Sequence, residues 1–308
     1  MKVFDVISTL ILLILLGVAI YFLYLNLPSE PIKLTNIISP ITDNQIILQN
    51  KEIQFYPNMR YSESRISYEI AGACSNEKVS QVEEVFSILE DRTILEFYSS
   101  GNGEIAVTCS DLAPEPKTEG HFVAGEGGPT EIVNSTLYSV ILSGKVALYR
   151  DEKCANPNIA LHEILHALGF DHNNNQNSIL YPTLDCDQEI DSYIIDEINR
   201  LYEVESAPDL TISKVEATKG GPYLNFEIEV ANQGLKLANN VVLSIYSNGN
   251  LEEEFNLDDI DIGTRKILKV ENLKISRSAN IIKFVVDSQN RIDEISENNN
   301  ELELVVEG

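Results

Sequence analysis

The longest run of apolar residues in the chain lies close to its N-terminus. No charged side chain occurs from Val6 to Ser29, and this stretch contains the run LILLILLGVAIYFLYLNL. A helix of this length can cross a hydrocarbon core about 30 Å thick. The pattern therefore predicts a transmembrane signal anchor over residues 6–27, preceded by a cytoplasmic tip over residues 1–5.

The charges that flank the run predict its orientation. Lys2 and the α-amino group precede it and Glu30 follows it. The positive-inside tendency then places the N-terminus in the cytoplasm and the rest of a single-pass protein outside the cell membrane. A cleaved signal peptide is the alternative, although the run exceeds the usual about 7–15 apolar residues and no Ala-x-Ala site follows it.

The next segment, residues 28–59, has no clear periodicity. Pro28, Pro31 and Pro40 interrupt it, and such spacing favours an extended chain. We expect a stalk with one short strand at Gln45–Leu48.

From residue 60 to residue 206, strand-like and helical patterns alternate. SGNG at Ser100–Gly103 is a turn signal, and GEGGPT at Gly125–Thr130 is expected to be a loop. The predicted strands, the last of them a candidate edge strand, are Arg65–Ala71, Ile94–Tyr98, Glu104–Cys109 and Lys145–Tyr149.

Two helices are predicted in this region besides the one described below. Glu77–Glu90 carries an apolar stripe and follows Asn76, a candidate N-cap. Asp187–Glu203, in which Asp191 is an alternative cap, has apolar residues on one face: Ile190, Ile194, Ile195, Ile198 and Leu201.

After Ala207 and Pro208 the pattern changes to short alternating runs separated by turn residues. These runs are LTISKV, YLNFEIEV, VVLSIYS, RKILKVE, NIIKFVVD and LELVVE. Their spacing predicts an antiparallel β-sandwich of about seven strands over residues 208–308. The predicted fold class is thus α+β: a transmembrane helix, a mixed domain over 60–206, and an all-β sandwich.

The densest candidate chemistry is the stretch LHEILHALGFDH, Leu161–His172, which holds three of the four histidines. On a helix each residue advances about 100°, so His162 and His166 lie one turn apart on one face. Neutral imidazoles suit Zn²⁺, and a catalytic zinc site uses three protein ligands with a fourth position open. His172 becomes the third ligand if the chain turns back at Gly169, which tolerates a left-handed conformation.

Glu163, next to His162, is the predicted catalytic residue. It would take a proton from a water activated by zinc and pass it to the leaving amine. Asn156 and Pro157 supply cap and first-turn chemistry for this helix, which should run to about Leu168. Incidental histidines on an ordinary helix, or a structural zinc site, are the alternatives. Glu163 favours catalysis because it is not needed as a ligand.

The pattern His-Glu-x-x-His-x-x-Gly-x-x-His resembles that of the metzincin zinc endopeptidases. SILYP, Ser178–Pro182, resembles their Met-turn in its matrixin form. Leu180 stands in place of the methionine that, in this family, packs beneath the zinc site as an apolar support. Leucine for methionine nearly conserves volume and usually costs under about 1.5 kcal/mol. Tyr181 is a candidate for stabilising the oxyanion or the product, with plain packing as the alternative.

The resemblance covers about Arg60–Glu203 and implies a fold as well as an activity. It implies a twisted mixed sheet with an active-site helix and a C-terminal helix, one catalytic Zn²⁺, and an edge strand that pairs with the substrate backbone. Some acidic side chains could bind Ca²⁺, as they do in related peptidases, but no dense Asp-x-Asp-x-Asp loop is present.

All four cysteines fall within residues 60–206, and the predicted topology exposes them to an oxidising compartment. Cys154 precedes the histidine-bearing helix and Cys186 follows the Met-turn. We favour disulfides Cys154–Cys186 and Cys74–Cys109 among the three connectivities, with free buried thiols as the alternative.

Composition limits the classes of partner. Acidic residues outnumber basic ones 48 to 22 and the formal net charge is −26, which speaks against nucleic-acid binding because phosphate recognition needs basic patches. The remaining histidine, His121, has no second histidine near it and is expected to be a surface or core residue.

The region from Asp209 onward resembles the immunoglobulin-like cell-adhesion-related domain of prokaryotic surface proteins. The residues that carry this resemblance are ANQG, Ala231–Gly234, and ISENNN, Ile295–Asn300. It implies a binding or spacing module with a surface-protein partner, and the alternative is a passive stabilising domain.

Together these observations predict a membrane-anchored, extracytoplasmic zinc metalloendopeptidase that hydrolyses peptide bonds of proteins. The alternative from another class is a surface adhesion or structural protein with a non-catalytic zinc site. A secreted protease would differ only in topology, and the sequence does not separate broad specificity from one dedicated substrate.

Overall fold

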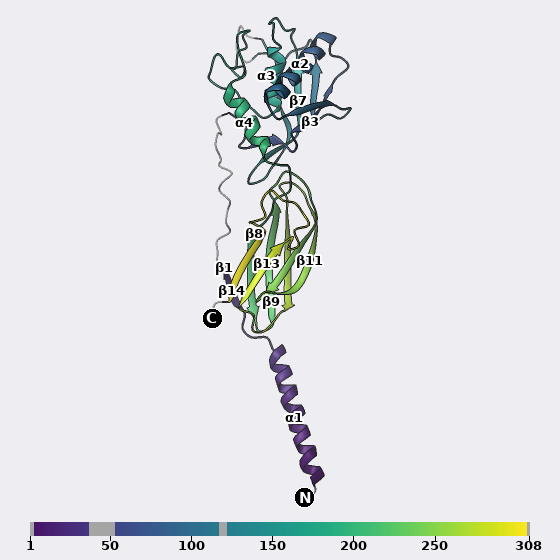
Figure 1. The fold of residues 1–308 in the computed structure, drawn as a ribbon, viewed down its shortest axis with the longest axis vertical. Helices are drawn as coiled ribbons and strands as arrows, with labels where there is room; N and C mark the ends of the chain where they lie inside the picture. Colours follow the sequence, from purple (N-terminus) through teal and green to yellow (C-terminus); the bar gives the residue numbers. More distant parts are fainter. Residues whose placement is uncertain (1–2, 37–52, 117–121, 307–308) are drawn as a thin grey trace. The chain divides into compact units, whose positions relative to one another are not determined.

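The structure is a computed structural model that describes residues 3–36, 53–116 and 122–306 (Figure 1). The chain forms two compact units. One comprises Met1–Asp43, Asp209–Asn232 and Leu237–Gly308, and the other comprises Asn44–Pro208 with Gln233–Lys236. The order of elements matches the predicted fold class: an apolar helix, a mixed sheet with helices, and an all-β domain.

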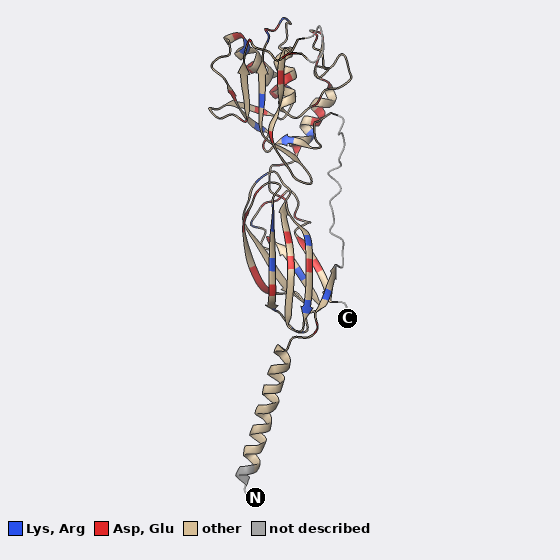
Figure 2. Ribbon diagram, turned by 180° about the vertical axis from the view of Figure 1, so that it is seen from behind, with Lys and Arg blue, Asp and Glu red and all other residues tan. Residues whose placement is uncertain are grey.

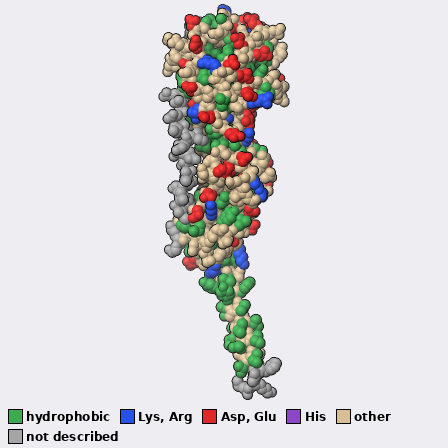
Figure 3. Space-filling view, viewed as in Figure 1, with side chains coloured by type: hydrophobic (Ala, Val, Ile, Leu, Met, Phe, Trp, Pro, Cys, Tyr) green, Lys and Arg blue, Asp and Glu red, His purple; other side chains and the backbone are tan. Residues whose placement is uncertain are grey.

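Helix α1, Val3–Asn26, contains the apolar run. Residues Val6–Asn26 are long and apolar enough to cross a membrane, and a signal sequence would pass the same test. Figure 3 shows hydrophobic side chains covering the surface of α1, and Figure 2 shows no charged residue along residues 6–26. An apolar helix exposed on every side lacks the polar face that a water-facing helix needs.

The mixed sheet of the second unit has the strand order β2-β7-β5-β3-β4, with β6 pairing β7. All the pairings along that order are parallel, whereas β6 runs antiparallel to β7. The strands are β2 Met59–Tyr61, β3 Arg65–Ile70, β4 Glu96–Ser99, β5 Ile105–Cys109, β6 Gly125–Asn134 and β7 Ser139–Leu148.

Three helices accompany this sheet and share its hydrophobic core: α2 Asn76–Arg92, α3 Asn158–Ala167 and α4 Ser192–Glu203. In α2 the buried stripe includes Val82, Val85 and Leu89. The N-cap of α2 is Ser75, whose hydroxyl accepts from the N–H of Lys78, so the prediction of Asn76 was one residue late. The cap of α4 is Asp191, the alternative named above.

Two predictions about the edge of this sheet were wrong. GEGGPT is not a loop but the first part of β6, and KVALY lies in β7, which pairs with β5 and β6 and is no edge. Glycines usually mark turns, but in β6 they permit close approach to α3, as shown below. Pro129 is tolerated because β6 pairs on one side only among the described strands.

The all-β unit contains seven strands from the predicted region: β8 Leu210–Gly220, β9 Tyr223–Asn232, β10 Ala238–Ser247, β11 Asn250–Ile260, β12 Arg265–Lys274, β13 Ile281–Val286 and β14 Glu301–Val306. An eighth, β1 Ile32–Asn36, comes from far earlier in the chain and pairs antiparallel with both β14 and β8. The strand order is β11-β10-β13-β14-β1-β8-β9-β12.

Strand β1 corrects the prediction of a stalk over residues 28–59. Five residues with one buried apolar side chain, Leu34, are too short a pattern to recognise, and the pairing partners follow more than 170 residues later. Residues 45–48, where the sequence predicted a strand, lie outside the described residues. Strand β1, which precedes the mixed domain, and strands β8 to β14, which follow it, therefore belong to one sandwich.

Leu34→Ala should lower the free energy of unfolding of the sandwich by about 2–3 kcal/mol, because Leu34 is 4% exposed and packs in the sandwich core. Urea denaturation of the whole chain measures this change. The matched control is Ile32→Ala in the same strand, since Ile32 is 44% exposed. Equal effects of the two substitutions would show that β1 is not a core strand.

Candidate metal centre

An acidic side chain that precedes α3 binds the first turn of this helix, and the sequence did not suggest this contact. The Glu152 carboxylate accepts hydrogen bonds from the N–H groups of Ile159 and Cys154, both at 2.9 Å. Pro157 occupies the cap position without a side-chain cap bond, so the expected cap Asn156 does not serve. A carboxylate at a helix N-terminus satisfies otherwise unpaired donors and complements the helix dipole.

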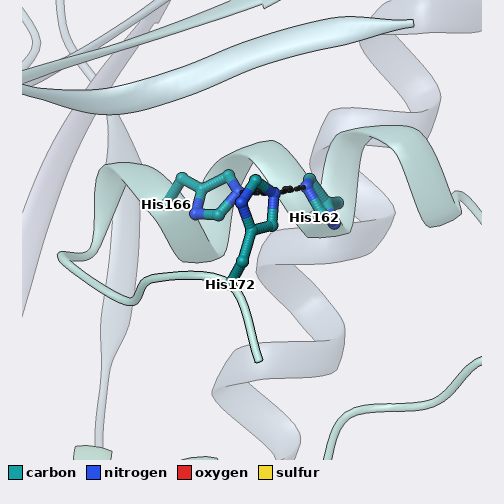
Figure 4. Close-up of side chains that lie close together, drawn as sticks. All are labelled: His162, His166 and His172. Atoms are coloured by element: carbon teal, nitrogen blue, oxygen red, sulfur yellow. Dashed lines mark hydrogen bonds between the residues drawn. The ribbon is translucent and has the colours of Figure 1, made fainter. Parts of the chain in front are cut away.

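The three histidines of the motif meet at one point, as Figure 4 shows. The Nε2 of His166 lies 3.0 Å from that of His162 and 3.1 Å from that of His172, and the third separation is 3.2 Å. His162 and His166 lie on α3, and His172 lies on the segment that follows it. The helix spacing and the later return of the chain are those expected from the sequence.

Gly169 permits that return. Its φ is +97°, a conformation that residues with a Cβ rarely adopt. A Cβ here would also lie 2.6 Å from Cγ of the buried Met59. Gly169 is therefore required both by the backbone turn and by the packing beneath it.

Two backbone carbonyls orient the imidazoles. The Nδ1 of His162 lies 2.6 Å from the carbonyl oxygen of Ile179, and the Nδ1 of His166 lies 2.7 Å from that of Phe170. A carbonyl can only accept, so each Nδ1 carries the proton and each Nε2 presents a lone pair. Fixing the second ring nitrogen in this way is the usual arrangement for metal-binding histidines.

Burial keeps these rings neutral. It lowers the pKa of His162 to about 3, together with the neighbouring His166, and it lowers the pKa values of His166 and His172. Lone pairs of neutral rings that converge at about 3 Å repel one another unless a cation lies between them. A tetrahedral zinc with nitrogens at about 2.0–2.1 Å separates them by about 3.3–3.4 Å, so the donor set fits that ion.

Glu163 lies on the same helix and is 5% exposed. Burial first, and then the nearby charge of Glu126, raises the pKa of Glu163 to about 8, against the lowering effect of a hydrogen bond from the N–H of Gly127. A carboxyl group with a pKa near neutrality can both accept and donate a proton at physiological pH.

Strand β6 crosses α3 at this glutamate with almost no space between them. A Cβ at Gly127 would lie 2.0 Å from the backbone oxygen of Glu163, and one at Gly125 would lie 2.7 Å from its side-chain Cγ. Gly125 and Gly127 thus let the edge strand lie directly against the helix. Sequence reasoning missed both, because the glycine-rich GEGGPT is typical of a loop.

The remaining predicted residues lie in the segment after His172. Leu180, at the Met-turn position, is 1% exposed, and its carbonyl accepts from the N–H of Asn173. Tyr181 is half-buried and its N–H donates to the carbonyl of Ser178. Its role towards an oxyanion stays a prediction.

The structure pairs Cys74 with Cys109 and Cys154 with Cys186, the connectivity favoured from the sequence.

Within residues 3–36, 53–116 and 122–306, the three histidines are the one group of three or more His, Cys, Asp or Glu side chains found with ligand atoms within 4.8 Å of one another. His121 lies outside the described residues.

Comparison with known families agrees with this geometry. The family model described as Matrixin matches residues 60–203, and a second model, CARDB, matches residues 207–304. The chain carries a matrixin domain followed by a CARDB domain. Matrixins are zinc metalloproteases, and CARDB is a cell-surface, adhesion-related domain, so the resemblances inferred from the sequence are confirmed.

Two of the solved structures that resemble part of this chain are of CARDB domains. A crystal structure of a CARDB domain from Pyrococcus furiosus, in complex with di-metal ions, is 22% identical, covers 32% of this chain and 88% of its own, and has a TM-score of 0.27. The solution structure of that domain is also 22% identical, covering 32% of this chain and 94% of its own, with a TM-score of 0.26. No curated protein matches the chain.

Proposed function

We propose that the protein is a membrane-anchored zinc endopeptidase whose matrixin domain lies outside the cytoplasm. In this proposal His162, His166 and His172 hold the zinc ion and Glu163 is the general base and acid. The observation that carries the proposal is the convergence of three oriented Nε2 atoms beside a buried glutamate. The matrixin match supports the class of reaction and of substrate.

Each of these residues has a separable task. When bound, zinc would acidify a water and polarise the scissile carbonyl. Glu163 accepts the proton of that water and returns it to the leaving amine, and its burial keeps its pKa in the range that allows both steps. The carbonyls of Ile179 and Phe170 hold the two helix-borne rings in the tautomer that ligation needs.

Strand β6 is the element that we propose pairs with the substrate. It bonds only to β7 among the described strands and crosses α3 at Glu163. A peptide added to this edge would be held mainly through its backbone, which gives affinity with little sequence preference. This replaces the edge strand expected from the sequence, Lys145–Tyr149.

Helix α1 and the two disulfides support the proposed location of the matrixin domain outside the cytoplasm. The apolar helix is long enough to anchor the protein, and the two disulfides are typical of an oxidising compartment. The CARDB domain supports a cell-surface setting and suggests an interaction with another surface protein.

His172→Ala should lower zinc affinity by at least about 100-fold, because it removes a ligand whereas loss of an outer partner alone costs about 10–100-fold. Metal analysis of the whole chain in detergent after dialysis against a graded chelator measures this change. The matched control is His121→Ala, the one histidine outside the motif. Retention of one zinc per chain by His172→Ala would contradict the assigned ligand set.

A soluble fragment that begins after β1 would be a poor substitute for the whole chain. It would lack β1, which pairs with two strands of the sandwich. A soluble form should therefore begin before Ile32.

A further inference from the structure

The loop between β13 and β14 of the sandwich gathers buried oxygen atoms that lack hydrogen-bond partners. Ser296 Oγ, Asn299 Oδ1 and Asn300 Oδ1 are buried and unpaired among the residues that the structure describes. Buried polar groups are nearly always paired, so three exceptions within five residues leave hydrogen-bonding or ligand capacity for a bound water or ion.

The side-chain amide of Asn300, whose oxygen is one of the unpaired atoms, lies beside two carboxylates. Asn300 is 5% exposed, and its Nδ2 lies 2.8 Å from Oε1 of Glu294 and 3.4 Å from Oε2 of Glu297. The unpaired Oδ1 belongs to the same amide group. An amide rotated by half a turn would present its oxygen to the carboxylates, and a cation between them would stabilise that orientation.

The loop carries a basic side chain, Arg291, but its guanidinium donates a hydrogen bond to Gln289. None of the ion pairs among the described residues includes Glu294 or Glu297. Buried Asp209 joins the cluster, since its Oδ1 accepts from Nδ2 of Asn299 at 3.1 Å. Burial, and then the charges of Glu297 and Asp209, raise the pKa of Glu294 to about 8 despite hydrogen bonds from Leu210 and Asn300.

We propose that this loop binds one Ca²⁺ ion through the carboxylates of Glu294 and Glu297 and the amide oxygen of Asn300. Ser296 and Asn299 offer the nearby oxygens that can complete the shell. Carboxylate, amide and hydroxyl oxygens are the ligands of a hard cation, and Ca²⁺ accepts six to eight of them in irregular geometry, whereas Mg²⁺ demands an octahedron. Glu297 is exposed, so the ion can enter from solvent.

The ion would fix the loop to the start of β8. Glu294 already accepts a hydrogen bond from the N–H of Leu210, the first residue of that strand. Calcium that binds the folded loop and not the unfolded chain stabilises the fold by mass action. This site is independent of the proposed zinc site, which lies in the other unit.

The test uses the whole chain in detergent, freed of calcium with a calcium-selective chelator and kept saturated with zinc. Titration with CaCl₂ in a calorimeter should show one equivalent bound, and saturating CaCl₂ should raise the melting temperature of the sandwich. Glu297→Gln should weaken calcium binding at least about tenfold, since it removes one charged ligand at an exposed position. Glu294→Gln, which keeps the shape of the buried side chain, should have the same effect.

Glu271→Gln is the matched control. Glu271 is exposed on β12 of the same sandwich, so the substitution removes one charge outside the loop. Absence of calcium binding by the parent chain would overturn the proposal. So would equal calcium affinity in the parent, the control and both loop variants, because the ion would then bind elsewhere.

Discussion

Glu163→Gln should retain one zinc per chain and slow peptide hydrolysis by about 10²–10⁴-fold. The substitution leaves the three histidines in place but removes the group that accepts and returns the proton, and general acid–base catalysis contributes about 10²–10⁴-fold. Glutamine has nearly the shape of the protonated glutamic acid, so the packing of β6 on α3 should persist. Zinc analysis and hydrolysis of a broad peptide library, on the same preparations, measure both quantities.

The matched control for this experiment is Glu84→Gln. Glu84 is exposed on α2, so the substitution changes the same charge away from the histidines. Undiminished hydrolysis by Glu163→Gln would exclude the proposed mechanism. One zinc per chain without cleavage in any variant would favour the alternative, a surface protein whose zinc site is only structural.

The histidine centre was predictable from the sequence because its geometry is local. His162 and His166 are related by one helical turn, and Gly169 marks the point at which the chain turns back to bring His172. These relations depend on periods of three to ten residues, which a sequence displays directly.

The elements that sequence reasoning missed depend on contacts between distant segments. Strand β1 is defined by its partners β8 and β14, and the five residues themselves carry little signal. Likewise, Glu152 caps α3 from seven residues before Ile159, outside the usual cap positions. The glycines of β6 looked like a loop because the helix that requires them lies more than 30 residues further along the chain.

The close approach of β6 to α3 also shows why catalysis should depend on a residue with no side chain. The N–H of Gly127 donates to the Glu163 carboxylate, and the Gly127 backbone lies against the helix at the same residue. The strand that we propose pairs with the substrate thus also positions the proposed base. A displacement of β6 should therefore misplace the Glu163 carboxylate.

Gly127→Ala should therefore reduce kcat/KM by about 10²-fold, since a misplacement of about 1 Å in a catalytic group has effects of that size. The added Cβ would lie 2.0, 2.7 and 2.8 Å from the backbone O, C and Cα of Glu163, and backbone atoms cannot rotate away. Overpacking of this kind also costs about 1–3 kcal/mol of folding free energy or more. Hydrolysis kinetics and urea denaturation of the zinc-loaded chain measure the two effects.

The neighbouring residue provides the control that isolates this contact. A Cβ at Gly128 would have nothing within 4 Å, and neither glycine has a positive φ. Gly128→Ala therefore makes the same chemical change in the same strand without the clash, and it should leave kcat/KM and stability nearly unchanged. If the two substitutions behave alike, the contact between β6 and α3 does not position Glu163. If Gly127→Ala alone loses activity while its zinc content stays at one per chain, the strand acts on the glutamate and not on the histidines.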